Sequence, residues 1–225
     1  MLIALVGGDG AGKSTAVREL SDWLTKAIDT RSTHLGRPAW SWTTYLVRFL
    51  AKGVRIATTP FTRHGSRLVN VNESGGGATD CLSMLKRLCT ARDRYNSYVA
   101  ARRFAAKGGI ALCDRYPLPW IRRMDAPLMD PSKPVQHKSS AVQILAQWEC
   151  NAYGRFILPD QLIVLRLDPQ VAVARKTDEE ASSVRARSQE VWNANWDVTT
   201  ADVVDASPAQ ENVLATLKSL IWSRL

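Results

Sequence analysis

A glycine-rich stretch near the start of the sequence constrains the fold more than any other feature. It follows the apolar run 2–6 and fits the phosphate-binding pattern G-x-x-x-x-G-K-[ST] at every fixed position. The pattern predicts a buried strand, a loop of backbone N–H groups around phosphate oxygens, and a helix whose N-terminus faces the same anion. The alternative is a glycine-rich turn that binds nothing. The residues expected to contact a nucleotide phosphate chain are Gly7, Gly8, Gly10, Ala11, Gly12, Lys13, Ser14 and Thr15.

Two residues of this loop carry distinct chemistry. Lys13 supplies a mobile cation for the β- and γ-phosphates, and the Ser14 hydroxyl is a ligand for a magnesium ion. A glycine loop predicts an NTPase or a kinase but does not choose between them. The other residues that reach the γ-phosphate distinguish between these two classes of enzyme.

A second group of polar residues follows the apolar run 110–113. Asp114, Arg115 and Tyr116 come directly after this run, which is typical of a central parallel strand. Ligands of open α/β sheets bind at the carboxyl ends of the strands, so we expect this group beside the glycine loop. Asp114 is a candidate to assist magnesium through water or to orient Arg115, and Arg115 is a candidate to hold an acceptor phosphate near the γ-phosphate. The alternative is a helix-capping Asp and a surface Arg.

The chain alternates strand and helix patterns, which predicts a three-layer α/β fold of the P-loop NTPase type as one domain over 1–225. A mostly five-stranded parallel sheet is expected, from strands over 2–6, 30–35, 110–113, 162–167 and 202–205. Amphipathic helices are expected over about 13–28, 79–107 and 135–156, from 169, around 188–195, and from 208.

Two segments stand apart from this alternation. The polar stretch 178–187 lacks an evident core face and suits a mobile lid. The segment 39–80 is an acceptor-side insertion rich in aromatic and basic residues. Helix-face core packing is the favoured interpretation of its aromatic group, with a substrate pocket or an interface as the alternative. The group consists of Trp42, Tyr45, Leu46, Phe49 and Leu50.

Charge and cysteine content limit the kinds of partner and the cellular location that we expect. Thirty Lys and Arg against 21 Asp and Glu give a net charge of +9, which suits anionic partners. A nucleotide already satisfies this, and no basic-aromatic module for nucleic acid is evident, so no nucleic-acid partner is expected. No apolar run is long enough to span a membrane or to act as a secretory signal. Four scattered cysteines without metal spacing predict reduced thiols and a cytoplasmic protein.

Together the motifs resemble thymidylate kinases, within the nucleoside-monophosphate kinase branch of P-loop proteins. The matching stretches occur in family order and cover nearly the whole chain. They are 9–15, 91–94, 114–116, 159–160, 168–169, 171–172, 175–176 and 205–208.

The resemblance implies transfer of the γ-phosphoryl group of ATP to a nucleoside monophosphate, with Mg²⁺ and with dTMP as the leading acceptor. It places Asp9 near the acceptor sugar, Arg94 at the acceptor base or phosphate, and Arg115 and Tyr116 on the acceptor side. The loop contains no Arg, and such family members bring catalytic arginines from the lid. Here these would be Arg185 and Arg187, unless the lid is solvated and carries none. A homodimer is compatible with the resemblance.

The departures from the family pattern concern the acceptor. Where the family has Arg-Glu-Pro-Gly-Gly, whose Arg grips the acceptor phosphate, this chain has only Arg37 and Pro38 in a different context. Arg37 is the candidate to keep that acceptor-binding role, and Val6 replaces a residue that is often acidic. The aromatic segment after residue 39 does not match either. A kinase acting on a nucleoside, a sugar or another metabolite therefore stays open. So does a non-catalytic nucleotide-binding module with 39–80 as its partner surface.

Overall fold

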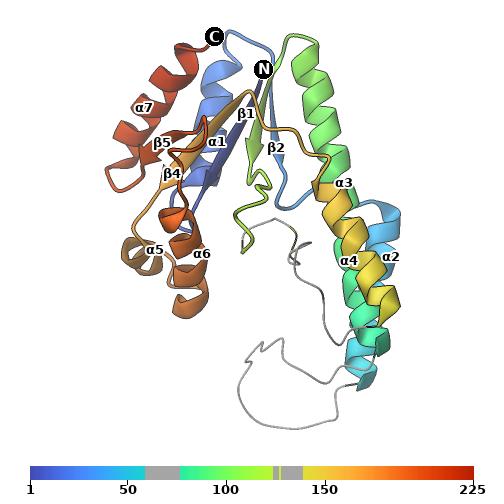
Figure 1. Ribbon diagram of the computed structural model, residues 1–225. Coiled ribbons are helices and arrows are strands. Elements are labelled where there is room, and N and C mark those ends of the chain that lie inside the picture. The colour runs from blue at the N-terminus through green and yellow to red at the C-terminus, as the bar shows by residue number, and fades with distance from the viewer. Residues whose placement is uncertain (59–76, 124–126, 128–138) are drawn as a thin grey trace. The chain divides into compact units, whose positions relative to one another are not determined.

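The computed structural model describes residues 1–58, 77–123, 127 and 139–225 (Figure 1). The chain forms two compact units, which are described in turn. The first consists of Met1–Pro38, Asn96–Leu128 and Phe156–Leu225, and the second of Ala39–Tyr95 and Met129–Arg155. The second unit contains the segment 39–80 that the sequence set apart, of which 59–76 lie outside the described residues.

The first unit is built on a five-stranded parallel sheet, as the sequence predicts. Its strands are ordered β2-β3-β1-β4-β5, with every neighbouring pair parallel. Strands β1 and β3 are buried along their whole length, which explains their continuous apolar sequences. The strands are β1 (Leu2–Gly7), β2 (Thr30–His34), β3 (Ile110–Asp114), β4 (Gln161–Arg166) and β5 (Asp202–Asp205).

Seven helices occur among the described residues, of which six overlap the ranges predicted from hydrophobic periodicity and α2 lies in the segment 39–80. The first unit contains α1 (Lys13–Leu24), α5 (Pro169–Arg175), α6 (Ala181–Asn193) and α7 (Gln210–Trp222). The second contains α2 (Trp42–Thr58) and α4 (Ser140–Tyr153), and α3 (Gly77–Ala106) contributes residues to both. None of these helices has the length and apolar content to cross a bilayer.

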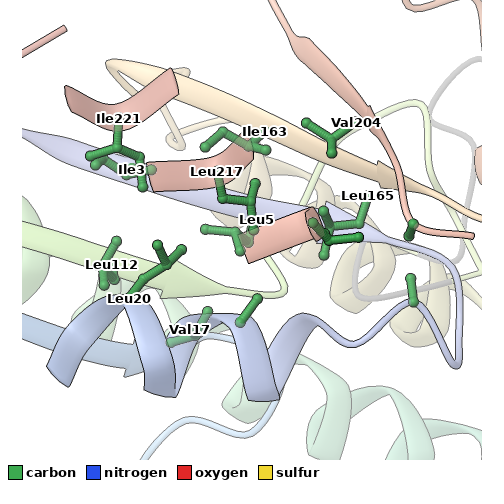
Figure 2. Packing of buried hydrophobic residues seen from close by; sticks show 14 of the residues in the cluster. Ile3, Leu5, Val17, Leu20, Leu112, Ile163, Leu165, Val204, Leu217 and Ile221 are labelled. Atoms are coloured by element: carbon green, nitrogen blue, oxygen red, sulfur yellow. The ribbon is translucent and has the colours of Figure 1, made fainter. Parts of the chain in front are cut away.

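Helices cover both faces of the sheet. On one face Val17 and Leu20 of α1 and Leu217 and Ile221 of α7 converge on Leu5 and its neighbours in the sheet (Figure 2). On the other face lies the final part of α3, whose Tyr98 packs 6.1 Å from the Tyr116 ring and 4.7 Å from the Phe156 ring. The fold is therefore a three-layer α/β arrangement.

The second unit combines a small apolar cluster with buried polar groups. Met84, Val142 and Ala146 form the cluster between α3 and α4. Asp93 of α3 accepts hydrogen bonds from the Ser41 backbone N–H (2.9 Å) and the Thr44 hydroxyl (2.6 Å). These bonds attach the start of α2 to α3.

Core packing of the aromatic group on α2 is a prediction that the structure contradicts. Trp42 is 82% exposed and Phe49 is 75% exposed, and Tyr45, Leu46 and Leu50 are each at least half exposed. Periodicity shows that a helix has an apolar face, but it does not show what covers that face.

The expectation that the segment 178–187 lacks a core face was wrong, whereas its role as a lid stays a prediction. Residues 181–187 form the first turns of α6 instead of an irregular interruption, and Val184 is completely buried in the main core cluster. A single Val among polar residues was enough to anchor the helix. All four cysteines are free in the structure.

Candidate active site

The glycine loop joins β1 to α1 at the carboxyl edge of the sheet. Gly12 is the N-cap of α1 and has a left-handed backbone with φ of 81°, a conformation that a side chain would oppose. The first backbone N–H groups of α1 therefore lie at the end of the loop, where their dipoles favour an anion.

Lys13 and Ser14 connect this loop to its surroundings. Lys13 is 5% exposed, and its Nζ donates to the Gly8 carbonyl at 2.6 Å. The Ser14 hydroxyl donates to Asp114 Oδ2 at 2.8 Å, which joins the start of α1 to the end of β3. The structure thus brings together the loop and the Asp that the sequence assigned to the same edge.

Asp114 is suited to hold a cation with Ser14. Its side chain is 3% exposed, and Oδ1 has no hydrogen-bond partner among the described residues. A hydroxyl and a carboxylate are the hard oxygen ligands that Mg²⁺ prefers, usually completed by phosphate oxygens and water. No group of three or more His, Cys, Asp or Glu in the described part of the chain forms a complete metal site. The residues present therefore fit a magnesium ion that arrives with a phosphate ligand.

His34 is a neighbour of Asp114 that the sequence analysis missed. Its Nε2 lies 3.8 Å from Asp114 Oδ2, because β2 pairs with β3 in a register that places His34 beside Asp114. The signal was the position of His34 at the carboxyl end of a predicted strand.

Arg115 and Tyr116 have different surroundings although they are adjacent. Arg115 lines a small cavity together with Lys13, and its backbone is left-handed with φ of 59°. Tyr116 is 3% exposed and donates its hydroxyl to the Ile157 carbonyl, and burial raises the pKa of this phenol. The guanidinium of Arg115 is therefore placed near Lys13, whereas the Tyr116 hydroxyl is bound within the core.

Arg187 of α6 is the lid arginine that reaches the loop. Its Nε donates to Asp9 Oδ2 and its Nη2 donates to Glu179 Oε2. Burial lowers the pKa of Arg187, but the hydrogen bonds and charges of these two carboxylates outweigh burial and raise it. Arg185 is exposed and makes no hydrogen bond or ion pair within the described part of the chain. Of the two predicted lid arginines, only Arg187 contacts the loop.

The buried face of α6 explains this placement. Val184, Ser188 and Val191 recur at intervals of four and three residues and are all buried. Ser188 lies so close to the loop that a Cβ added at Gly8 would be 3.0 Å from its hydroxyl oxygen. Since Arg187 precedes Ser188, the packing of α6 on Gly8 carries the guanidinium to Asp9.

Arg175 of α5 is a second contact that the sequence analysis did not assign to the site. Its Nη1 donates to the Gly10 carbonyl at 3.4 Å and to the Ala206 carbonyl at 3.1 Å, and its Nη2 donates to the Ser207 carbonyl at 3.1 Å. This side chain therefore joins the glycine loop to the end of β5. The available signal was the position of Arg175 shortly after Asp168 and Pro169, which cap and begin α5.

Arg37 and Arg94 are the remaining acceptor candidates. Arg37 is exposed, and its guanidinium makes no hydrogen bond or ion pair among the residues described. Arg94 belongs to the second unit, where it is 5% exposed and its Nη1 donates to the Tyr153 hydroxyl. Glu149, which is near Arg94, has a pKa raised by burial and partly lowered again by Arg87 and Arg94.

Comparison with known proteins adds no family to this description. A scan against protein-family models found no matching family, and a search of curated proteins found no significant match.

Proposed function

We propose that this protein is an ATP-dependent phosphotransferase that moves the γ-phosphoryl group of ATP to a nucleoside monophosphate, with dTMP as the first candidate acceptor. The observation that carries the proposal is the hydrogen bond from Ser14 of the glycine loop to Asp114 at the end of β3. In P-loop enzymes a loop Ser or Thr and an Asp on a nearby strand hold the magnesium ion of the nucleotide.

The donor side of the reaction is assigned to the loop. The backbone N–H groups before α1 bind the phosphate chain, and Lys13 exchanges the Gly8 carbonyl for the β- and γ-phosphate oxygens. Ser14 and Asp114 are the residues that would hold a magnesium ion, which would supply positive charge to the phosphate chain. Phosphoryl transfer needs little covalent work from the protein, so positioned charges supply most of the catalysis.

Arginines are assigned to the transferring group and to the acceptor. Arg187 supplies positive charge beside the loop from α6, where Asp9 and Glu179 already hold its guanidinium. Arg115, which lines a cavity with Lys13, binds the acceptor phosphate bidentately. Asp9 holds the Arg187 guanidinium, which leaves this carboxylate for the transferring phosphate during turnover, and Asp9 lies on the acceptor side of the loop.

The nature of the acceptor rests on the family resemblance and on the basic charge of the chain. The net charge of +9 favours an acceptor that is itself anionic. We also propose a cytoplasmic location, consistent with the four free cysteines. A homodimer stays a prediction.

Coupled measurement of ATP turnover with Mg²⁺ tests this function. The acceptor panel contains dTMP, the other nucleoside monophosphates, nucleosides and simple sugars, with Lys13→Ala as the inactive control. We expect turnover to depend on a nucleoside monophosphate and to be fastest with dTMP. Stimulation by a nucleoside or a sugar alone would show that the acceptor belongs to that class of compound instead of the nucleoside monophosphates. ATP binding without acceptor-dependent turnover would contradict the enzyme and favour a nucleotide-binding module.

A further inference from the structure

A large cavity in the first unit lies apart from the residues assigned to phosphoryl transfer. Its volume is about 750 Å³, and none of its lining residues belongs to the glycine loop or to the group after β3 that starts at Asp114. Leu162, near the start of β4, forms part of its wall. The strands are parallel, so this is the amino edge of the sheet, opposite the edge that carries the loop.

The walls of the cavity are apolar and contain an accessible aromatic ring. Trp120, Leu158 and Val198 line it and are 40%, 54% and 78% exposed. An exposed indole offers a flat face on which a planar ring stacks favourably. The cavity volume lies within the range of about 300–1,000 Å³ that is usual for small-molecule sites.

The polar groups of the cavity are neutral or already used. Glu190 is the single charged lining residue, and its two carboxylate oxygens accept the backbone N–H groups of Arg122 (2.9 Å) and Arg123 (2.7 Å). An anionic ligand would find no cationic side chain among the lining residues, and both oxygens of the Glu190 carboxylate are already engaged by backbone N–H groups. The cavity therefore favours an uncharged ligand.

Asn195 supplies a donor whose orientation is fixed. Its Oδ1 accepts the backbone N–H of Asp197 at 3.2 Å, and a backbone N–H is always a donor. The other atom of the Asn195 amide is therefore Nδ2, which can donate a hydrogen bond to an acceptor on a ligand. Asn193 adds a second side-chain amide to the same lining.

We propose that this cavity is an effector site for an uncharged, planar heteroaromatic group that carries carbonyl or ring-nitrogen acceptors. Trp120 stacks on the ring, the apolar side chains of the open cavity flank it, and the Asn195 amide donates to its edge. The binding of such a ligand is independent of the proposed function.

Helix α6 connects this cavity to the loop. Glu190 and Asn193 line the cavity, and Arg187, one turn earlier on the same helix, contacts Asp9. A ligand held against Asn193 restrains the turn that presents Arg187, and it keeps the guanidinium on Asp9 and Glu179. The effector role, which rests on the proposed function, is therefore inhibition of turnover.

Isothermal titration calorimetry with caffeine tests the site on the full chain. Caffeine is uncharged and planar, and it has two carbonyl acceptors and no hydrogen-bond donor. We expect one caffeine per chain, with affinity unchanged by saturating Mg-ADP and at least about tenfold above that of indole, which lacks such acceptors. Absence of caffeine binding, displacement by ADP, or equal affinity for indole would each overturn the proposed site.

Matched variants locate the binding. Ala194 lines the cavity, so Ala194→Trp fills it and abolishes caffeine binding, whereas Ala215→Trp on the exposed face of α7 leaves binding unchanged. Asn195→Asp keeps the oxygen that accepts from Asp197 and removes the donor, so it weakens caffeine binding at least about threefold. Asn212→Asp is its control. Unaltered binding in Asn195→Asp contradicts the site even if Ala194→Trp does not fold.

The effector role has its own readout. Saturating caffeine is expected to lower kcat at least about threefold in the wild type and to leave kcat unchanged in Asn195→Asp at the same concentration. Binding without any change in kcat of an active enzyme would overturn the effector role. An inactive protein that still binds caffeine would refute the proposed function and leave the site supported.

Discussion

Single side chains at the carboxyl edge of the sheet owe their positions to the strands and helices before them. Ser14 and Asp114 are separated by a hundred residues of sequence. The sequence nevertheless predicts their proximity, because Ser14 lies at the start of a helix and Asp114 at the end of a strand, both at the same edge of the sheet. His34 and Arg175 were not foreseen, since the pairing register of β2 and the reach of a long guanidinium cannot be read from a motif. Motifs with fixed backbone geometry are predictable, and contacts made by long side chains across elements are not.

Removal of the Lys13 ammonium is expected to stop phosphoryl transfer. Lys13→Ala should reduce kcat by at least about a hundredfold, because it deletes a charge directed at the transferring phosphate. Steady-state ATP turnover measures this, with the exposed Lys26→Ala as the control for loss of a surface lysine. A near-normal rate in Lys13→Ala would contradict the assigned role.

Arg187 and Arg185 form a matched pair on one helix. Arg187→Ala should lower kcat by at least about a hundredfold and change ATP affinity much less, whereas Arg185→Ala should leave both near the wild-type values. Kinetics at varied ATP concentration separate the two effects, and Arg187→Lys should recover part of kcat. If Arg185→Ala proves the more damaging substitution, the guanidinium that reaches the transferring phosphate is not the one now bound to Asp9.

Helices α2 and α6 show how far an element can be predicted from its own sequence. The aromatic group of α2 was expected on a buried helix face; it does lie on a helix, but that face is exposed. The opposite error occurred at α6, where a polar segment hides a narrow buried face around Val184 and Ser188. Burial depends on the partner element, which a local pattern does not contain.

The buried face of α6 is expected to contribute measurably to stability. Val184 is completely buried in the core cluster, so Val184→Ala should lower the free energy of unfolding by about 2 kcal/mol through lost burial and a residual cavity. Urea denaturation followed by circular dichroism measures the change. Val198→Ala, at a position that is 78% exposed, should shift it by less than about 0.5 kcal/mol. Equal effects of the two substitutions would contradict the packing of α6.

At the scale of the molecule, Asp160 joins three distant segments of the first unit. Its Oδ2 accepts the backbone N–H of Leu2 in β1 at 2.6 Å, and its Oδ1 accepts from Arg102 of α3 at 2.6 Å. Arg102 also donates to the Leu158 carbonyl before β4. The sequence predicted the strands and helices that meet here, but the order β2-β3-β1-β4-β5 and this contact depend on long-range pairing.

The pH dependence of stability should show how much the ionised Asp160 carboxylate contributes to the free energy of unfolding. Burial opposes its charge, but hydrogen bonds from Leu2 and Arg102 outweigh burial, so its pKa lies below the ordinary value of 3.8. A carboxylate with a lowered pKa stabilises the fold above the unfolded pKa, and this contribution is lost as the pH falls through the folded pKa.

Asp160→Asn should therefore lower the free energy of unfolding at pH 7 by at most about 2 kcal/mol, since the side chain is partly exposed. Thermal melting across pH 2–7 should show the gap between variant and wild type narrowing below about pH 4. The exposed Asp22→Asn should show no such gap. A gap that is constant across the whole pH range would assign the effect to shape instead of charge.

The strand order also determines when the sheet can form. β1 is the central strand, but it pairs with β3 from Ala111 onward and with β4 from Gln161 onward. At about 5–20 residues per second, a ribosome needs roughly 10–30 s after β1 to complete its second partner. Until β3 has been made β1 has neither neighbour, and until β4 has been made it has only one. Synthesis and refolding are therefore the stages at which this protein is most exposed to aggregation, and slow long-range pairing sets their pace.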